Sequence, residues 1–92
     1  MRFEWDPRKA KSNIAKHRVS FAEAASVFSD PLARIFPDED HSGYESREII
    51  VRQSAGKRLL LVSFTETKPD LVRIISVRRA TKTEREDYEE NI

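Results

Sequence analysis

Three extended segments in the second half of the chain constrain the fold most. We expect extended strands along Arg47 to Gln53, Arg58 to Thr65 and Leu71 to Arg79, which are rich in leucine, isoleucine and valine. The two links between them are short and carry Gly56 and Pro69, residues typical of turns. Strands joined this tightly pair as antiparallel neighbours. The sequence therefore predicts a three-stranded antiparallel meander.

Helix signals lie on both sides of this meander. Asp6-Pro7 combines an N-cap with proline at the first helical position, and Asp30-Pro31 ends the second helix. Ser20 to Glu23 and Thr81 to Glu84 have the spacing of capping boxes, in which serine or threonine and glutamate each bind the other's amide. The last helix is expected to reach about Glu90. Two further segments, Arg2 to Trp5 and Leu32 to Phe36, are expected to be short strands.

Length and composition limit what these elements can form. A chain of 92 residues with 38% hydrophobic content suffices for one domain, residues 1–92, with a small core. We expect an α+β fold, in which two N-terminal helices pack on an antiparallel sheet and a third helix follows it. The absence of cysteine fits a reducing compartment. Without an apolar run of about 20 residues or a signal-peptide core, the chain is predicted to be cytoplasmic, with no membrane partner.

Charges are segregated along the chain although the net charge is only +1. The segment from Arg47 to Lys82 contains nine lysines and arginines but only three acids. The segment from Thr83 to Ile92 contains five acids but only one arginine. Separation of sign is common where one surface meets a polyanion, although 36% charged residues also describe an ordinary solvated surface.

The strand register decides which charges become neighbours. If Gln53 pairs with Arg58, and Arg58 with Arg78, two arginines stand opposite each other and need a shared anion or acid. Alternation places Val72, Ile74, Ser76 and Arg78 on one face of the last strand, and Leu71, Arg73, Ile75, Val77 and Arg79 on the other. The second face would align Glu48, Ser63 and Arg73 across the sheet.

The basic residues of the sheet are the strongest functional signal in the residues themselves. Guanidinium groups match phosphate oxygens and stabilise developing negative charge. The alternative is that single arginines pair with glutamates and fix the last helix to the sheet. The candidates for phosphate binding are Lys57, Arg58, Arg73, Arg78, Arg79 and Lys82.

Cleavage of RNA would also need a base and an acid. The candidates are His41, whose side-chain type titrates at about pH 6.5, together with Glu45 and Tyr88. His41 could equally be an exposed loop residue. His17 shares a helical spacing with Ala10, Asn13 and Ile14, so it is expected on the weakly apolar, buried face of the first helix and to be structural. Asp38 to Asp40 lack the spacing of a calcium loop, so neither a metal nor a cofactor is predicted.

Taken together, the residues resemble one family along nearly the whole chain. It is the BrnT family, the toxic halves of bacterial type II toxin–antitoxin pairs. The residues that carry the resemblance are Phe3 to Pro7, Lys9, Asn13, Lys16-His17, Val19 to Phe21, Glu23-Ala24, Val27-Phe28, Asp30-Pro31, His41-Ser42, Glu45, Arg47, Ser54, Gly56, Arg58, Arg73 to Ser76, Arg78 to Ala80, Glu84 and Tyr88.

The resemblance implies a RelE-like fold and ribonuclease activity that arrests growth. It also implies a cognate BrnA-like antitoxin whose ribbon-helix-helix domain represses the shared operon, so operator DNA would be contacted only through the antitoxin. Two positions depart from the family pattern: Arg18 and Arg52 stand where glycine is expected. If residue 18 is a left-handed helix cap, a side chain there costs about 1 kcal/mol.

The leading hypothesis is therefore a metal-independent endoribonuclease. Arg78 and Arg79 would hold the scissile phosphate with support from Arg58, while His41 or Tyr88 transfers protons. The flanking RNA backbone would follow Arg52, Lys57, Arg73 and Lys82. The alternative is a non-catalytic module that binds an acidic protein or RNA through the same basic surface.

Overall fold

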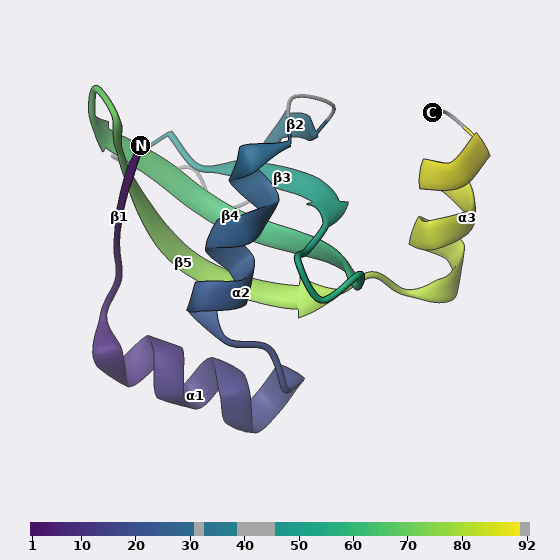
Figure 1. The fold of residues 1–92 in the computed structure, drawn as a ribbon, viewed down its shortest axis with the longest axis horizontal. Helices are drawn as coiled ribbons and strands as arrows, with labels where there is room; N and C mark the ends of the chain where they lie inside the picture. The colour runs from purple at the N-terminus through teal and green to yellow at the C-terminus, as the bar shows by residue number, and fades with distance from the viewer. Residues whose placement is uncertain (31–32, 39–45, 91–92) are drawn as a thin grey trace.

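The computed structural model describes residues 1–30, 33–38 and 46–90 of the 92-residue chain. Within these residues the fold is α+β, with three helices and a five-stranded mixed sheet (Figure 1). None of the described helices is both long and apolar enough to cross a bilayer. In chain order the elements are β1 (Arg2–Glu4), α1 (Pro7–His17), α2 (Phe21–Ser26), the 3₁₀ turn η1 (Val27–Ser29), β2 (Arg34–Pro37), β3 (Glu48–Gln53), β4 (Leu59–Lys68), β5 (Leu71–Arg79) and α3 (Lys82–Glu90).

The strands lie in the order β1-β5-β4-β3-β2, so the predicted meander of β3, β4 and β5 is confirmed. The expectation of a purely antiparallel sheet is wrong at one edge, where β1 pairs with β5 in parallel. Strand direction is fixed by a tight turn only between consecutive strands, and β1 is the first strand whereas β5 is the last. The pattern of single strands therefore could not give the direction of this pair.

The turn between β3 and β4 is one residue longer than predicted. Gln53 pairs with Leu59, and the carbonyl of Arg58 accepts a hydrogen bond from the amide of Ser54 at 2.8 Å. Lys57 adopts a left-handed conformation with φ of 62°, which accommodates the extra residue. A separate turn sets the pairing of β4 with β5: Lys68 pairs with Leu71 across Pro69-Asp70, and Asp70 adopts a left-handed conformation with φ of 66°. This turn is tighter than the link expected from Glu66 to Asp70, so Arg78 lies opposite Leu61 and the predicted pairing of Arg58 with Arg78 is wrong.

A β-bulge in β5 also changes the predicted faces. Ile75 is an extra residue between successive pairs of the ladder, so Val72 and Val77 both point into the core. Arg79 therefore lies on the same face as Val77, and Arg78 lies on the other. The expected alternation is wrong beyond Ile75. The expected row across the sheet is wrong too, because Glu48 pairs with Phe64, Ser63 with Ser76 and Arg73 with Thr65.

The main core lies between the sheet and the first two helices. Figure 1 shows α2 lying across the sheet. Three aromatic rings reinforce this layer: Phe28 makes edge-on contacts with Phe3 and Phe64, at centroid distances of 5.2 and 4.9 Å. The buried residues of this core are Val19, Phe21, Ala24, Val27, Ile50, Leu60, Val62, Phe64, Val72, Ile74 and Val77.

The third helix contacts the opposite face. Tyr88, only 8% exposed, packs with Val51, Leu59 and Ala80. The predicted capping box at the start of α3 is confirmed in both directions: the amide of Glu84 donates to Thr81 Oγ1 at 3.1 Å, and the amide of Thr81 donates to Glu84 Oε1 at 2.9 Å. A single aromatic anchor and polar contacts therefore hold this otherwise charged helix.

Asn13 joins α1 to the edge of β5. The strand β1 covers this edge only as far as Arg73, which leaves the backbone of Val77 without a strand partner there. The Asn13 amide supplies the missing bonds: Oδ1 accepts from the Val77 amide at 3.1 Å, and Nδ2 donates to the Val77 carbonyl at 2.8 Å. Nδ2 also donates to the carbonyl of Val19 at 3.1 Å. One buried side chain thus seals the sheet edge and sets the position of α1.

We expect Asn13→Ala to lower the free energy of unfolding by about 2–3 kcal/mol, because it leaves buried backbone groups without partners. Urea denaturation followed by circular dichroism measures this change. Ser12→Ala on the exposed side of the same helix serves as the matched control and should change the stability by less than about 0.5 kcal/mol. Equal stability of the two variants would contradict the role assigned to Asn13.

Arg18 ends α1 in the left-handed conformation, with φ of 58° and ψ of 33°, and its amide donates to the carbonyl of Ile14. A side chain in this region is strained by about 1 kcal/mol. We therefore expect Arg18→Gly to raise the unfolding free energy by about 0.5–1 kcal/mol in urea denaturation. Arg8→Gly, in the first turns of α1, should lower it by about 1 kcal/mol. A decrease for Arg18→Gly would contradict the strain argument.

Candidate functional site

Two adjacent clefts lie at the end of the sheet where the chain leaves β5 for α3. The larger, here called the basic cleft, has a volume of about 630 Å³; the second, the side cleft, has a volume of about 420 Å³. Arg79 and Arg85 line both clefts and so join them. The basic cleft is also lined by Arg52, Gln53, Lys57, Arg58, Leu59, Tyr88 and Glu89, and the side cleft by Lys16, His17, Arg18, Arg78, Ala80 and Thr81.

Most of the site residues predicted from the sequence meet at these clefts. Arg73 does not: it bonds to Glu4 beside β1, about 20 Å along β5 from Arg79. Lys82 is exposed at the start of α3 and lines neither cleft. His41 and Glu45 lie outside the described residues. The predicted residues brought together are Arg52, Lys57, Arg58, Arg78, Arg79 and Tyr88.

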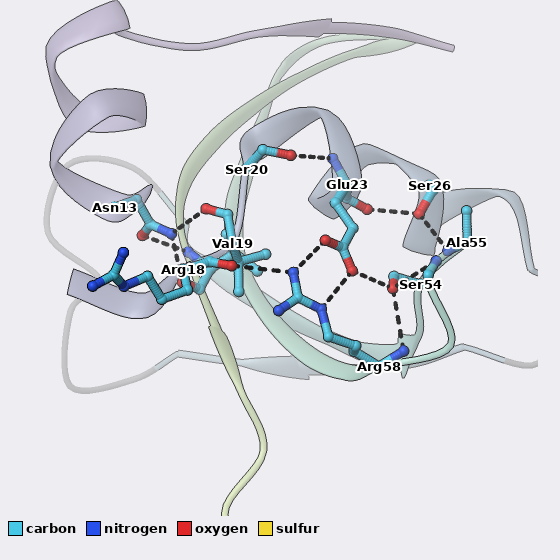
Figure 2. A network of polar contacts seen from close by, with 11 residues as sticks. Asn13, Arg18, Val19, Ser20, Glu23, Ser26, Ser54, Ala55 and Arg58 are labelled. Carbon is cyan, nitrogen blue, oxygen red and sulfur yellow. Dashed lines mark hydrogen bonds and ion pairs between the residues drawn. The ribbon is translucent and has the colours of Figure 1, made fainter. Parts of the chain in front are cut away.

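Arg58 is held at the edge of the basic cleft by Glu23 of α2 (Figure 2). Its Nε donates to Glu23 Oε2 at 3.0 Å, its Nη2 donates to Glu23 Oε1, and the same Nη2 reaches the carbonyl of Arg18 at 3.2 Å. The forked bond with Arg58 holds the pKa of the Glu23 carboxyl below its usual range. Glu23 therefore stays ionised and fixes this guanidinium.

This use of Glu23 corrects the capping box predicted at the start of α2. Ser20 Oγ accepts from the amide of Glu23 at 3.0 Å, as expected, but the Glu23 carboxylate points to the β3–β4 turn, where it accepts from Ser54 Oγ at 2.6 Å (Figure 2). Gly56 allows this approach, because a Cβ there would stand 3.1 Å from Glu23 Oε2. The expected return bond gives way to a stronger, charge-assisted one.

Arg78 is paired with Glu84 of α3. Its Nη1 and Nη2 donate to the two carboxylate oxygens at 2.6 and 2.8 Å. Chiefly through this fork, and helped by the Thr81 amide, the pKa of Glu84 falls to about 2. The alternative in which an arginine fixes the last helix to the sheet therefore describes Arg78. Its guanidinium still lines the side cleft.

Arg52 links three elements at the basic cleft. Its Nε bonds to Asp30 Oδ2 at 2.5 Å and its Nη1 donates to the Tyr88 hydroxyl at 2.6 Å. Both bonds raise the pKa of the guanidinium, the one to Tyr88 more strongly. The guanidinium carbon of Arg34 lies over the ring of Tyr88, 5.5 Å from the ring centroid. The second position where the family pattern has glycine thus carries an arginine that orients the hydroxyl of Tyr88.

Three other cations differ from these. The side chains of Lys57, Arg79 and Arg85 bond to no other described residue, although they line the basic cleft together. Lys57 and Arg79 are exposed. Three positive side chains around one concavity leave their charges available to an anion. Cations held by carboxylates therefore shape the clefts, while unpaired cations are available for binding.

Sequence reasoning missed three residues of the clefts. Arg85 was counted with the acidic C-terminal segment, but one turn of α3 brings it beside Arg79. Arg18 was expected only to be a helix cap and was not counted among the phosphate-binding residues. His17 was assigned to the buried face of α1 because of its spacing from Asn13, yet it is exposed at the last position of the helix and lines the side cleft. The position of His17 at the helix terminus was the signal that could have identified it.

Within residues 1–30, 33–38 and 46–90, no group of three or more histidine, aspartate or glutamate side chains is arranged to hold a metal ion. The acidic residues Glu39 and Asp40, which were considered as ligands, lie outside these ranges.

The Arg78–Glu84 pair makes a pH-dependent contribution to stability. The pKa of Glu84 is about 2 in the folded chain, against about 4.3 for an unfolded glutamate. The stabilisation is therefore present above about pH 4.3 and disappears as the pH falls through about 2. The side chains are 42% and 35% exposed, so screening limits the contribution to about 1 kcal/mol.

We expect Glu84→Gln to be less stable than the wild type by about 1 kcal/mol at pH 6, and this difference to shrink towards pH 2. Glutamine retains an oxygen for the Thr81 amide, so the comparison isolates the charge. Urea denaturation of both proteins at pH 6 and pH 2.5 measures it. A difference independent of pH would contradict the ion-pair assignment.

Comparisons with known proteins agree on one family. Residues 5–84 match the family described as "Ribonuclease toxin, BrnT, of type II toxin-antitoxin system". The crystal structure of the Brucella abortus ribonuclease toxin BrnT is similar to this chain, with a TM-score of 0.69 and 27% sequence identity over 89% of this chain and 99% of that one. The search of curated proteins gave no match. The fold and the family match together show that the chain belongs to the BrnT family of type II toxin–antitoxin ribonuclease toxins.

Proposed function

We propose that this chain is a RelE-like toxin that arrests growth by cutting RNA internally without a metal ion, and that a cognate antitoxin neutralises it. The observation that carries the proposal is the pair of clefts joined by Arg79 and Arg85. Guanidinium groups placed around a phosphodiester can do what a bound metal ion does in other nucleases, which is to neutralise charge that develops on the phosphate oxygens.

The substrate class follows from the chemistry of the sugar. RNA carries its own nucleophile, the 2′-hydroxyl, which attacks the adjacent phosphorus and expels the 5′-oxygen of the next nucleotide. The products are a 2′,3′-cyclic phosphate and a free 5′-hydroxyl. The protein then has to position the phosphate, stabilise the pentacoordinate state and move protons. DNA lacks this hydroxyl and would remain uncut.

The arginines divide this work according to their partners. Arg79 and Arg85, whose guanidinium groups bond to no other described residue, would hold the scissile phosphate between the clefts. Arg78, although paired with Glu84, lines the side cleft and would orient the same phosphate from the opposite side. Lys57, Arg58 and Arg52 would follow the RNA backbone along the basic cleft. Nothing in the described residues supports a role for Arg73 in this path.

The proposed antitoxin partner follows from the family and from the charge of the clefts. A type II toxin is paired with a protein antitoxin, and a basic concavity of this size suits an acidic segment of such a partner. By resemblance the antitoxin would be BrnA-like, with a ribbon-helix-helix domain that binds operator DNA. In that arrangement the toxin would contact DNA only through the antitoxin.

A second candidate function is a non-catalytic binding module. It is favoured by one observation: Arg52, Arg58 and Arg78 all have side-chain partners within the fold, so part of the cationic cluster is structural. Such a module would bind RNA or an acidic protein at stoichiometric ratios without breaking a bond. Product formation distinguishes it from the proposed toxin.

The test uses the full chain, free of antitoxin, with a labelled RNA oligonucleotide in EDTA and the matching DNA oligonucleotide beside it. We expect cleavage of RNA only, with 2′,3′-cyclic phosphate ends. Folded protein that binds RNA but gives no product, either alone or with ribosomes, would contradict the proposal and favour the binding module.

Arg79→Ala is expected to lower kcat/KM for RNA cleavage by about 10²–10³-fold, the effect of removing one group that stabilises a developing oxyanion. Stability should change little, because the guanidinium bonds to no other described residue. Arg8→Ala, the same charge change in the exposed first turn of α1, is the matched control and should retain activity. Arg79→Ala that folds and cleaves RNA normally would remove Arg79 from the site.

A further inference from the structure

The side cleft is lined by a histidine together with the cations proposed above to bind phosphate. His17 lines this cleft together with Arg78, Arg79 and Arg85. It also lines a smaller adjoining cavity of about 90 Å³, again together with Arg78, and with Ser63 and Ser76 of the sheet. Two cavities thus place the exposed imidazole next to Arg78, at the boundary between the side cleft and the open part of the sheet.

The fold fixes the backbone of His17 on both sides. One turn earlier, Asn13 binds the edge of β5 through the amide and carbonyl of Val77. One residue later, Arg18 ends the helix in the left-handed conformation, and its carbonyl accepts a bond from Arg58. These contacts fix the end of α1 against β5, and they place the backbone of His17 beside the side cleft.

The reaction needs a proton acceptor for the 2′-hydroxyl, and other described groups are poorly suited. Tyr88 is buried, and its hydroxyl accepts a bond from Arg52. Glu23 and Glu84 are forked onto arginines, which lower the pKa of both carboxyls. Glu89 lines the basic cleft but not the side cleft, which Arg78 lines. Among these groups, only the histidine side-chain type is suited to take up a proton near neutral pH.

We propose that His17 is the general base of RNA cleavage, a role that rests on the ribonuclease function proposed above. The neutral imidazole takes the proton of the 2′-hydroxyl as the 2′-oxygen bonds to phosphorus. The bond from phosphorus to the 5′-oxygen breaks, and solvent water gives that oxygen its proton. Arg78 and Arg79 compensate the charge that develops on the two non-bridging oxygens. His17 would touch the substrate and is therefore a catalytic residue.

The charged groups that face His17 make the role testable by pH. They are Lys16 and Arg18 from the end of α1, Arg78 and Arg79 from β5, and Arg85 from α3. Side chains of lysine and arginine ordinarily titrate above about pH 10, so an inflection of log(kcat/KM) near neutral pH that is lost in His17 variants would identify this imidazole as the group. The rate should rise with pH through this inflection, because the deprotonated form is the active one.

The experiment compares wild type, His17→Ala and His17→Gln on one RNA oligonucleotide in EDTA. We expect kcat to fall by about 10²–10⁴-fold in both variants and the inflection to vanish. The Kd for the same oligonucleotide with a 2′-deoxy substitution at the cut site should stay within about threefold, and added imidazole should restore part of the activity of His17→Ala. Lys11→Ala, on the exposed side of α1, is the matched control.

Several outcomes would overturn the assignment. Wild-type kcat in both variants would remove His17 from catalysis, and a loss of activity that follows a loss of RNA affinity would make it a binding residue. A substrate whose 5′-oxygen is replaced by sulfur needs no protonation of its leaving group. Recovery of His17→Ala on that substrate would show that His17 gives a proton instead of taking one. If wild-type protein cuts no RNA, the proposed function fails first and this proposal with it.

Discussion

Several arginines gather at one end of a small sheet, and the fold has to supply counter-charges for them there. Like charges this close repel each other unless counter-charges separate them. Three elements of the chain supply the counter-charges: Glu23 from α2, Asp30 after η1 and Glu84 from α3. Each pair also ties its element to the sheet. The same ion pairs therefore help to attach these segments to the sheet and set the shape of the clefts.

The division between paired and unpaired cations explains how a stable site can remain basic. Arg58 and Arg78 are each forked onto one carboxylate, which fixes their orientation and offsets their charge. Arg79 and Arg85 lie between the two clefts without such a partner among the described residues. Binding of phosphate at these two positions would add the missing counter-charge, so the substrate completes an arrangement that the protein leaves open.

Local signals in the sequence predicted the elements well because they depend on neighbouring residues. The N-cap at Asp6, the capping box of Thr81 and Glu84, and the meander all follow from spacing within a few positions. Register did not follow, because it depends on the left-handed turn residues Lys57 and Asp70 and on the bulge at Ile75. The parallel strand β1 joins residues almost 70 positions apart, which no local pattern encodes.

The candidate site was predicted in composition but not in arrangement. Arginine chemistry identified the basic surface, whereas its division between the two faces of β5 depends on the bulge at Ile75. His17 was misassigned for a related reason. The spacing of His17 from Asn13 places both residues on one side of α1. However, the core ends before the last turn of the helix, so the side chain of His17 lines the side cleft and is not buried.

The division between paired and unpaired arginines also decides how their substitutions should be interpreted. Replacing Arg58 or Arg78 removes a cation from a cleft, but it also leaves Glu23 or Glu84 without its partner and weakens the attachment of a helix. Lost toxicity in such variants would therefore combine an effect on stability with an effect on chemistry. Arg79 and Arg85 have no such structural partner among the described residues, so a loss of activity on their substitution would point to the proposed reaction and not to the fold. The ion pairs therefore decide which variants separate folding from function. The arginines that the fold holds most firmly are the least informative about the reaction.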